Sequence, residues 1–201
     1  MRKNDTRTER SKRILIYGDS NVWGDNFVGS RIRHSDRWVN RLARALRGKA
    51  HITADGACGR VAGDFCADKP HKNGKSAFAA VLQQAGTVDI IIIALGTNDL
   101  QQKYQRTSQH IIDDLLAYQK LAPKADIIYL LPPPFSTGED SGPEFTEQSE
   151  AIRQEILRNK ETLGEYIELP FIPLSDGIHF SAKGHRLLAR IVKNALKARQ
   201  A

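Results

Sequence analysis

Asp89-Ile90-Ile91-Ile92-Ile93-Ala94 lies near the middle of a chain of 201 residues. The apolar side chains of this segment do not alternate with polar ones, as they would in a strand with one solvated face. An unbroken apolar run of strand length, rich in β-branched residues, is typical of a strand that is buried on both faces. The segment therefore predicts an inner strand of a parallel sheet that is covered on both sides.

Similar runs recur along the chain. Apolar segments of strand length span Arg13–Tyr17, Ala50–Ala54, Val88–Leu95, Ala125–Leu131 and, more weakly, Tyr166–Leu169. Helical patterns fall between and after them: a helix capped by Ser35 or Asp36 that runs to Arg47, then Lys75–Gln84, Ser108–Leu121, Thr146–Leu163 and Ser181 to about Ala198. Because parallel strands need connections of this length, the alternation predicts an α/β fold with a central parallel sheet of about five strands and helices on both faces.

The length and composition favour a single domain. A chain of 201 residues with 40% hydrophobic content can bury one sizeable core, which we assign to residues 13–201. The formal net charge of +7 comes in large part from the chain ends, above all from residues 1–12, which are predicted to form a flexible basic tail. Solvated ends account for this charge, so no nucleic-acid partner is expected.

Secretion and membrane signals are weak. The apolar run that ends at Tyr17 is too short for a secretory leader, and no run reaches membrane length. Cys58 and Cys66 are too few for a disulfide framework and lack the Cys-x-x-Cys spacing of a metal pair. We therefore expect a cytoplasmic protein without a membrane partner, with a processed secreted form as the alternative.

Three reactive side chains follow the first and the last predicted strands. Ser20 lies in Gly18-Asp19-Ser20-Asn21, and Asp176 and His179 lie in Asp176-Gly177-Ile178-His179. Ligands of open α/β sheets bind at the carboxyl ends of the strands, so these residues are expected to meet on one rim. An imidazole can take the proton of a serine hydroxyl while a carboxylate holds the ring in the correct tautomer. A tight turn at Gly177 would place Asp176 on Nδ1 of His179 and leave Nε2 facing Ser20.

Donors for the negative charge of such an attack follow the other strands. Gly59 comes after the second strand and Asn98 after the third. The predicted oxyanion hole consists of the backbone N–H groups of Ser20 and Gly59 and the side-chain amide of Asn98. Gly59 suits this role because a residue without Cβ lets the backbone approach a substrate closely.

Taken together, these motifs resemble those of the SGNH (GDSL-type) hydrolase superfamily. The four matching blocks are Gly18-Asp19-Ser20-Asn21, Gly56-Ala57-Cys58-Gly59-Arg60, Gly96-Thr97-Asn98-Asp99 and Asp176-Gly177-Ile178-His179-Phe180. The chain is most similar to the bacterial arylesterase and acyltransferase branch, through Ser20–Gly24, Gly56–Arg60, Gly96–Leu100 and the Pro132-Pro133-Pro134 turn. In order and spacing the resemblance runs from about Arg13 to Ala195.

The resemblance implies a fold and a set of roles. The fold would be a flavodoxin-like three-layer sandwich, with no metal or cofactor and with long loops that can carry homo-oligomer contacts. Ser20 would be the nucleophile, Asp176 and His179 would complete the triad, and Gly59 and Asn98 would join Ser20 in the oxyanion hole. Cys58 stands where relatives of this branch usually carry Ser or Asn, and Val61 stands where they often carry Thr; both changes concern the shape of the acyl pocket.

Three longer loops are predicted to form the mouth of the substrate site: residues 24–34, 62–74 and 132–142. Trp23 and Phe135 either wall an acyl pocket there or serve simple packing.

Other polar side chains have structural interpretations. Arg60 either meets an anionic substrate or pairs with an acidic residue of a loop, and the pairing is favoured. Asp19 is expected to accept hydrogen bonds from nearby backbone N–H groups. His185 is expected near solvent on the last helix, and the histidines show no paired metal-ligand spacing.

The expected function is hydrolysis of carboxylic esters, with short-chain acyl or aryl groups, through an acyl-enzyme on Ser20. A carbohydrate O-acetylesterase or an acyltransferase could use the same triad. A protein of another class, a module that binds an anionic polymer or nucleic acid and has an idle site, would fit the basic composition. Ester hydrolysis that depends on Ser20 separates the enzymes from the binding module.

Overall fold

A computed structural model describes residues 10–28, 30–137 and 144–199. Most of the predicted basic tail, residues 1–9, lies outside this part of the chain. The first strand begins at Lys12, one residue before the predicted domain boundary, and Arg10 forms an ion pair with Asp89 at 2.5 Å. Among the described residues, no helix combines the length and the apolar character needed to cross a membrane.

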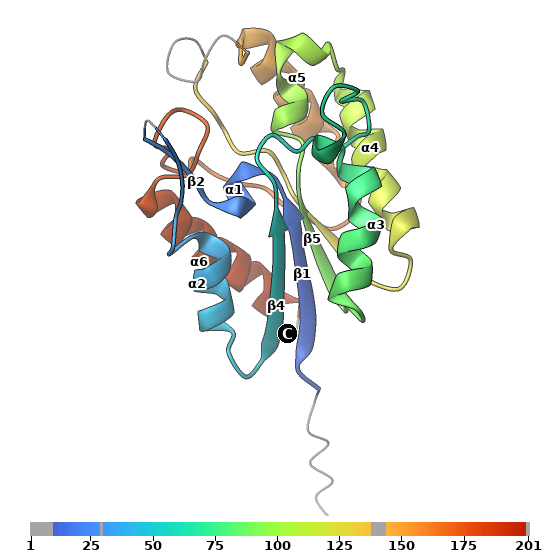
Figure 1. Cartoon of the computed structure of the whole chain (residues 1–201), viewed down its shortest axis with the longest axis vertical. Helices are drawn as coiled ribbons and strands as arrows, with labels where there is room; N and C mark the ends of the chain where they lie inside the picture. Colours follow the sequence, from blue (N-terminus) through green and yellow to red (C-terminus); the bar gives the residue numbers. More distant parts are fainter. Residues whose placement is uncertain (1–9, 29, 138–143, 200–201) are drawn as a thin grey trace, which may run out of the picture.

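A five-stranded parallel sheet forms the centre of the molecule (Figure 1). Its strands are β1 (Lys12–Gly18), β4 (Ala50–Gly56), β5 (Ile90–Ala94), β6 (Asp126–Leu130) and β7 (Tyr166–Ile167). They lie in the order β4-β1-β5-β6-β7, and each neighbouring pair is parallel. Counted along the chain within this sheet, the order is that of flavodoxin-like folds. The predicted fold class and all five predicted strands are confirmed.

The inner strands bury both of their faces, as predicted. In β5, Ile90 and Ile92 belong to one hydrophobic cluster, whereas Ile91 and Ile93 belong to the other. Neighbouring β1 behaves in the same way. Since successive side chains of a strand point to opposite faces, an all-apolar run supplies two cores at once.

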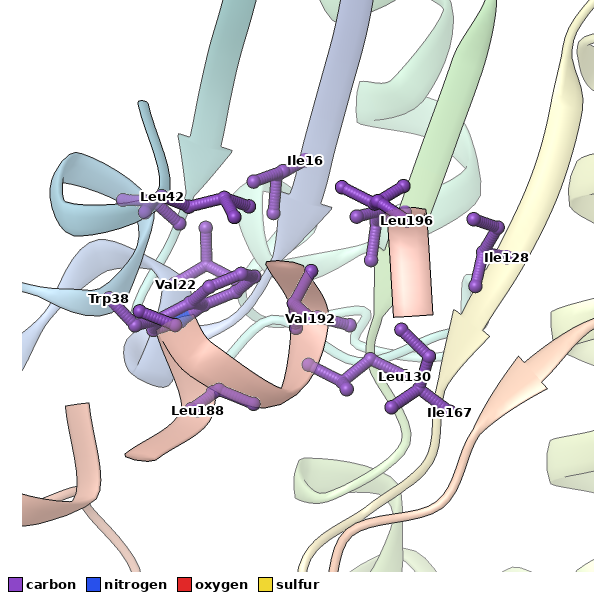
Figure 2. Packing of buried hydrophobic residues seen from close by; sticks show 14 of the residues in the cluster. Ile16, Val22, Trp38, Leu42, Ile128, Leu130, Ile167, Leu188, Val192 and Leu196 are labelled. Carbon is purple, nitrogen blue, oxygen red and sulfur yellow. The ribbon is translucent and has the colours of Figure 1, made fainter. Parts of the chain in front are cut away.

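One face of the sheet is covered by α2 (Trp38–Ala45) and α6 (Ala182–Ala198). Trp38 and Leu42 of α2 pack with Leu188 and Val192 of α6 against the sheet (Figure 2). The short α1 (Ser20–Trp23) contributes Val22 to the same cluster.

The other face is covered by α3 (Gly74–Ala85), α4 (Ser108–Leu121) and α5 (Glu147–Arg158) (Figure 1). Tyr17 of β1, Phe78 of α3 and Tyr118 of α4 meet there as aromatic pairs with ring centroids 5.0 to 6.0 Å apart. Helices on both faces therefore make the predicted three-layer sandwich.

The described part of the chain also contains short 3-10 helices. These are η1 (Pro70–Lys72), η2 (Asn98–Leu100), η3 (Gln102–Tyr104) and η5 (Lys160–Leu163).

Strand order creates a crevice at one end of the sheet. From β1 the chain leads outward to β4 at the edge, and from β4 it returns across β1 to β5. The chain thus leaves β1 toward one edge of the sheet and leaves β5 toward the other edge. Where two neighbouring parallel strands connect in opposite directions, a crevice opens beyond their carboxyl ends. Ser20 follows β1 and Asn98 follows β5, so the topology places both on this crevice.

Three predictions of local structure were wrong. The predicted loop 24–34 contains an antiparallel hairpin of β2 (Asp25–Val28) and β3 (Ser30–Arg33). Helix α2 begins at Trp38 after Arg37, and neither Ser35 nor Asp36 caps it, because the Asp36 carboxylate pairs with Arg41 and Arg44 instead. The predicted helix Thr146–Leu163 ends at Arg158 and continues as the separate turn η5. In the predicted loop 132–142, residues 138–142 lie outside the described part of the chain.

Candidate active site

Ser20 is the first residue of α1, directly beyond the end of β1. The Asp19 carboxylate accepts the backbone N–H of Asn21 at 2.9 Å and caps this short helix, as predicted. Burial raises the pKa of Asp19 to about 6, although the backbone hydrogen bond from Asn21 opposes the shift. As the first helical residue, Ser20 has a backbone N–H with no carbonyl one turn behind it, so this donor can serve a substrate.

The segment from Asp176 to His179 forms the predicted tight turn. Oδ1 of Asp176 accepts the backbone N–H groups of Ile178 at 3.1 Å and His179 at 2.7 Å. Oδ2 lies 2.6 Å from Nδ1 of the His179 ring. Gly177 has a φ of 81°, a left-handed conformation that favours glycine. One carboxylate thus shapes the turn and orients the imidazole.

The fold brings the serine and the histidine together across 159 positions of sequence. Nε2 of His179 lies 3.1 Å from Oγ of Ser20, within hydrogen-bond distance. The Asn21 side chain holds the two segments in place: its amide donates to the carbonyl of Ile178 at 3.2 Å, and its oxygen accepts the N–H of Phe180 at 3.0 Å. Asn21 was part of the recognised motif, but the sequence did not reveal this contact.

The surroundings of His179 favour its charged form. Burial by itself lowers the pKa of His179, but the hydrogen bond from the ring to Asp176 and the negative charges of Asp176, Asp25 and Asp19 outweigh burial, so the pKa rises above its ordinary value. Burial likewise raises the pKa of Asp176, but the hydrogen bonds from His179 reverse this and hold it below its usual range. The two shifts favour a positively charged His179 ring beside a negatively charged Asp176 carboxylate.

Asn98 lies in η2, and its amide is held at both ends. Nδ2 donates to the carbonyl of Arg60 at 3.1 Å, and Oδ1 accepts Nε2 of Gln101 at 2.9 Å. Because Gln101 occupies the amide oxygen, the NH₂ group is turned toward the segment that follows β4, and its second hydrogen can serve another acceptor. Nothing in the local sequence pattern singles out Gln101.

Gly59 has a left-handed φ of 75°. A Cβ at this position would lie 2.6 Å from Nζ of Lys72, a side chain that comes from η1. The missing Cβ of Gly59 thus leaves room for the Lys72 side chain. Lys72 is a further residue beside the predicted hole, and no motif in the sequence indicates it.

Asp99 joins the segments that carry the two predicted donors. Its carboxylate oxygens lie 3.0 and 2.9 Å from the backbone N–H of Ala62, on the segment that begins with Gly59. Burial raises the pKa of Asp99 to about 7. The contact fixes the spacing between Asn98, which precedes Asp99, and the loop after β4.

The predicted pocket residues have different surroundings. The Arg60 guanidinium pairs with Asp55 at 2.6 Å, donates to the carbonyl of Gly18 at 3.1 Å and lies 4.2 Å from the centroid of the Tyr17 ring. Arg60 therefore pairs with an acidic residue, as favoured, but Asp55 belongs to strand β4 and not to a loop. Phe135 packs against Phe145 with ring centroids 5.3 Å apart.

The remaining pocket candidate, Trp23, is half-buried beneath the guanidinium of Arg33. Its backbone carbonyl accepts hydrogen bonds from Arg33 and Arg37, both at 2.9 Å.

His185 lies on the last helix, α6, as predicted, but the prediction that it lies near solvent was wrong. The residue is 1% exposed, its Nδ1 accepts the backbone N–H of Trp38 at 3.3 Å, and its ring packs edge-on against His34 and Phe180. Burial lowers the pKa of His185 to about 3, so the ring is neutral. Within the described ranges, no group of three or more histidine, cysteine, aspartate or glutamate side chains is placed to hold a metal ion.

Known structures share this architecture over nearly the whole chain. An aryl esterase from M. smegmatis is similar with a TM-score of 0.84 and 25% identity, over 94% of this chain and 99% of that one. A carbohydrate acetylesterase family member from Sinorhizobium meliloti has a TM-score of 0.79 and 26% identity, over 93% and 98% of the two chains. A second carbohydrate acetylesterase from S. meliloti, 21% identical over 94% and 100% of the chains, shares the fold with a TM-score of 0.85.

A search of curated protein sequences finds no match to this chain. The model of the GDSL-like lipase/acylhydrolase family, in contrast, matches residues 16–187, a range that contains Ser20, Asn98, Asp176 and His179. Together with its α/β architecture, this match shows that the chain belongs to the GDSL-like lipase/acylhydrolase family and is an SGNH-type serine hydrolase.

Proposed function

We propose that the protein hydrolyses carboxylic esters with short acyl or aryl groups through an acyl-enzyme on Ser20. The observation that carries this proposal is the continuous chain from Oγ of Ser20 to Nε2 of His179 at 3.1 Å and from Nδ1 to Asp176 at 2.6 Å. A serine hydroxyl is a weak nucleophile unless a base takes its proton, and this arrangement supplies the base and orients it.

In the first half of the reaction, His179 takes the proton of Ser20 as Oγ attacks the ester carbonyl. The tetrahedral oxyanion accepts hydrogen bonds from the backbone N–H groups of Ser20 and Gly59 and from the amide of Asn98. His179 then returns the proton to the leaving alcohol, which departs from the acyl-enzyme. Water, activated by the same ring, attacks the acyl group and releases the acid.

The test compares wild-type protein with Ser20→Ala on a short-chain nitrophenyl ester. The variant should lose at least about a thousandfold in kcat, because the nucleophile and its base act as a unit. Ser11→Ala, which removes an exposed hydroxyl just before β1, at the opposite end of that strand from Ser20, is the matched control and should retain full activity. An inactive wild type, or a fully active Ser20→Ala, would refute the proposal.

Carbohydrate O-acetyl ester hydrolysis is the second candidate. It is favoured by the likeness at 26% identity to a carbohydrate acetylesterase family member. Sugar acetates assayed in parallel with nitrophenyl esters of increasing acyl length separate the two substrate classes. Added alcohols test acyl transfer, because an alcohol that competes with water yields a new ester from the same acyl-enzyme.

Binding of an anionic polymer is less well supported than catalysis. Several basic side chains of the described surface pair with carboxylates within the chain, among them Arg44 with Asp36 and Arg199 with Asp126 and Glu165. Such pairs neutralise positive charge locally. Polymer binding that survives Ser20→Ala and collapses with added salt would support the binding module instead.

A further inference from the structure

A second carboxylate lies beside His179, on the side of the ring that faces the nucleophile. Asp25 is the first residue of β2, and it is 2% exposed. Its Oδ2 lies 4.0 Å from Nε2 of His179, whereas Asp176 contacts the opposite ring nitrogen, Nδ1, at 2.6 Å. The imidazole is thus flanked by one carboxylate at each nitrogen.

Asp25 also contacts the segment that carries the predicted oxyanion donor. The Sγ–H of Cys58 donates to Oδ2 of Asp25 at 3.4 Å, and Cys58 directly precedes Gly59. One buried carboxylate therefore adjoins both the candidate base and the loop of the candidate oxyanion hole.

We propose that Asp25 is a positioning residue that acts through His179, by stabilising the imidazolium that forms when the ring takes the proton of Ser20. This inference rests on the proposed ester chemistry. The proton moves from Oγ to Nε2, the ring becomes positive between Asp176 and Asp25, and the proton then passes to the oxygen of the leaving alcohol. Asp25 takes no proton in this sequence.

The distance of 4.0 Å suits this role. A direct hydrogen bond from Nε2–H to Asp25 would compete with Ser20 and with the leaving alcohol for the same proton. At 4.0 Å the carboxylate is beyond hydrogen-bond distance, but its charge still acts strongly on the ring, because both groups are largely removed from water. Asp25 therefore stabilises the charged ring without holding its proton.

The other groups that face His179 come from three parts of the chain. Asp176 lies on the same loop, Ser20 belongs to α1, and Asp19 joins β1 to α1. The negative charge of Asp19 also raises the pKa of His179, but by less than the charge of Asp25. Asp25 and Asp176 are thus the carboxylates expected to hold the imidazolium. Among the charges that raise the pKa of His179, that of Asp25 is the next largest contribution after Asp176.

The test is the titration of His179 in wild-type protein and in Asp25→Asn, followed by NMR of the imidazole protons and assigned with His179→Gln. Asparagine keeps the shape and the acceptor for Cys58 but removes the charge. The pKa of His179 should fall by about one unit or more, since an opposite charge within 4–6 Å shifts a pKa by about that amount. Asp113→Asn removes a charge from the exposed side of α4 and should leave this pKa in place.

The pH profile of ester hydrolysis provides the second readout. In Asp25→Asn the acid limb of kcat/KM should move to lower pH by the same amount as the NMR titration, and kcat at neutral pH should fall about tenfold. If the pKa of His179 moves by less than about 0.3 unit, or if only KM rises while both titrations stay in place, the proposal is overturned. If Asp25→Asn does not fold, Asp25→Ser is titrated in its place with the same expected shift.

Failure of the proposed function would look different. An inactive wild type would refute ester hydrolysis, but the NMR titration needs no substrate and still measures the effect of Asp25 on the ring. An active wild type with an unmoved His179 pKa in Asp25→Asn would refute the role of Asp25 alone.

Discussion

Replacement of Asn98 by alanine tests the oxyanion hole. The substitution removes the only side-chain donor of the predicted hole and leaves the two backbone donors, Ser20 and Gly59, in place. Loss of one such donor costs about 3 kcal/mol of transition-state stabilisation, or roughly a 100- to 1000-fold fall in kcat. KM should change little, because in the proposed mechanism the amide binds an oxygen that becomes negative only as Ser20 attacks.

The same substitution has a separate effect on stability. Asn98 is 8% exposed and makes two side-chain hydrogen bonds, to the carbonyl of Arg60 at 3.1 Å and from Gln101 at 2.9 Å. Asn98→Ala removes both hydrogen bonds, and each bond contributes about 1 kcal/mol to stability. The free energy of unfolding should therefore fall by about 2 kcal/mol. Urea denaturation measures this loss, and initial rates on a nitrophenyl ester give kcat and KM.

Gln101→Ala is the matched control for Asn98→Ala. It breaks one of the same two hydrogen bonds but leaves the Asn98 amide in the site, so kcat should fall by no more than about tenfold. A folded Asn98→Ala that keeps kcat within about threefold of wild type would refute the donor role. Equal losses in the two variants would show instead that the η2 turn, and not the donor, determines the rate.

Three further outcomes follow from the structure. The kcat/KM of wild-type protein should fall as the pH drops through the pKa of His179, because only the neutral ring can take a proton from Ser20. The midpoint of this fall should lie above 6.5, the ordinary pKa of histidine, and a midpoint below 6.5 would contradict the raised pKa. Burial holds the pKa of His185 down to about 3, so the unfolded chain binds a proton that the folded chain does not, and stability should fall as the pH drops from 6.5 to 3. The full loss is about 4 kcal/mol, and urea denaturation of His185→Asn across this window should lack it. Asn21→Ala breaks both bonds between α1 and the Asp176–Phe180 segment, and kcat should fall at least about tenfold without loss of the fold, as measured by nitrophenyl ester hydrolysis and circular dichroism.

The architecture could be predicted because its signals are local. The isoleucine run of β5 has no polar side, and the structure places its alternate residues in two separate cores. Helical patterns between the strands were long enough to cross the sheet, which leaves few topologies for a parallel arrangement. These features depend on the period of apolar residues, and a sequence displays that period directly.

Local details that depend on distant partners were predicted less well. Asp36 looks like a helix cap, but its carboxylate pairs with Arg41 and Arg44. His185 was expected near solvent, yet it accepts a hydrogen bond from Trp38, on the helix packed beside its own. Neither the competing arginines nor the neighbouring helix changes the local pattern, so the sequence around Asp36 and His185 could not indicate them.

The sequence by itself determined the α/β class, the order of the strand-forming segments and the motifs that carry Ser20, Asn98, Asp176 and His179. Only the tertiary structure decided that Asn21 joins the nucleophile turn to the histidine loop and that Asp25 lies 4.0 Å from the imidazole. The physical reason is one of range. Strands and helices follow from periodicities within some ten residues, whereas side-chain contacts across more than 150 positions exist only after the sheet and its crossovers have brought the loops to one edge.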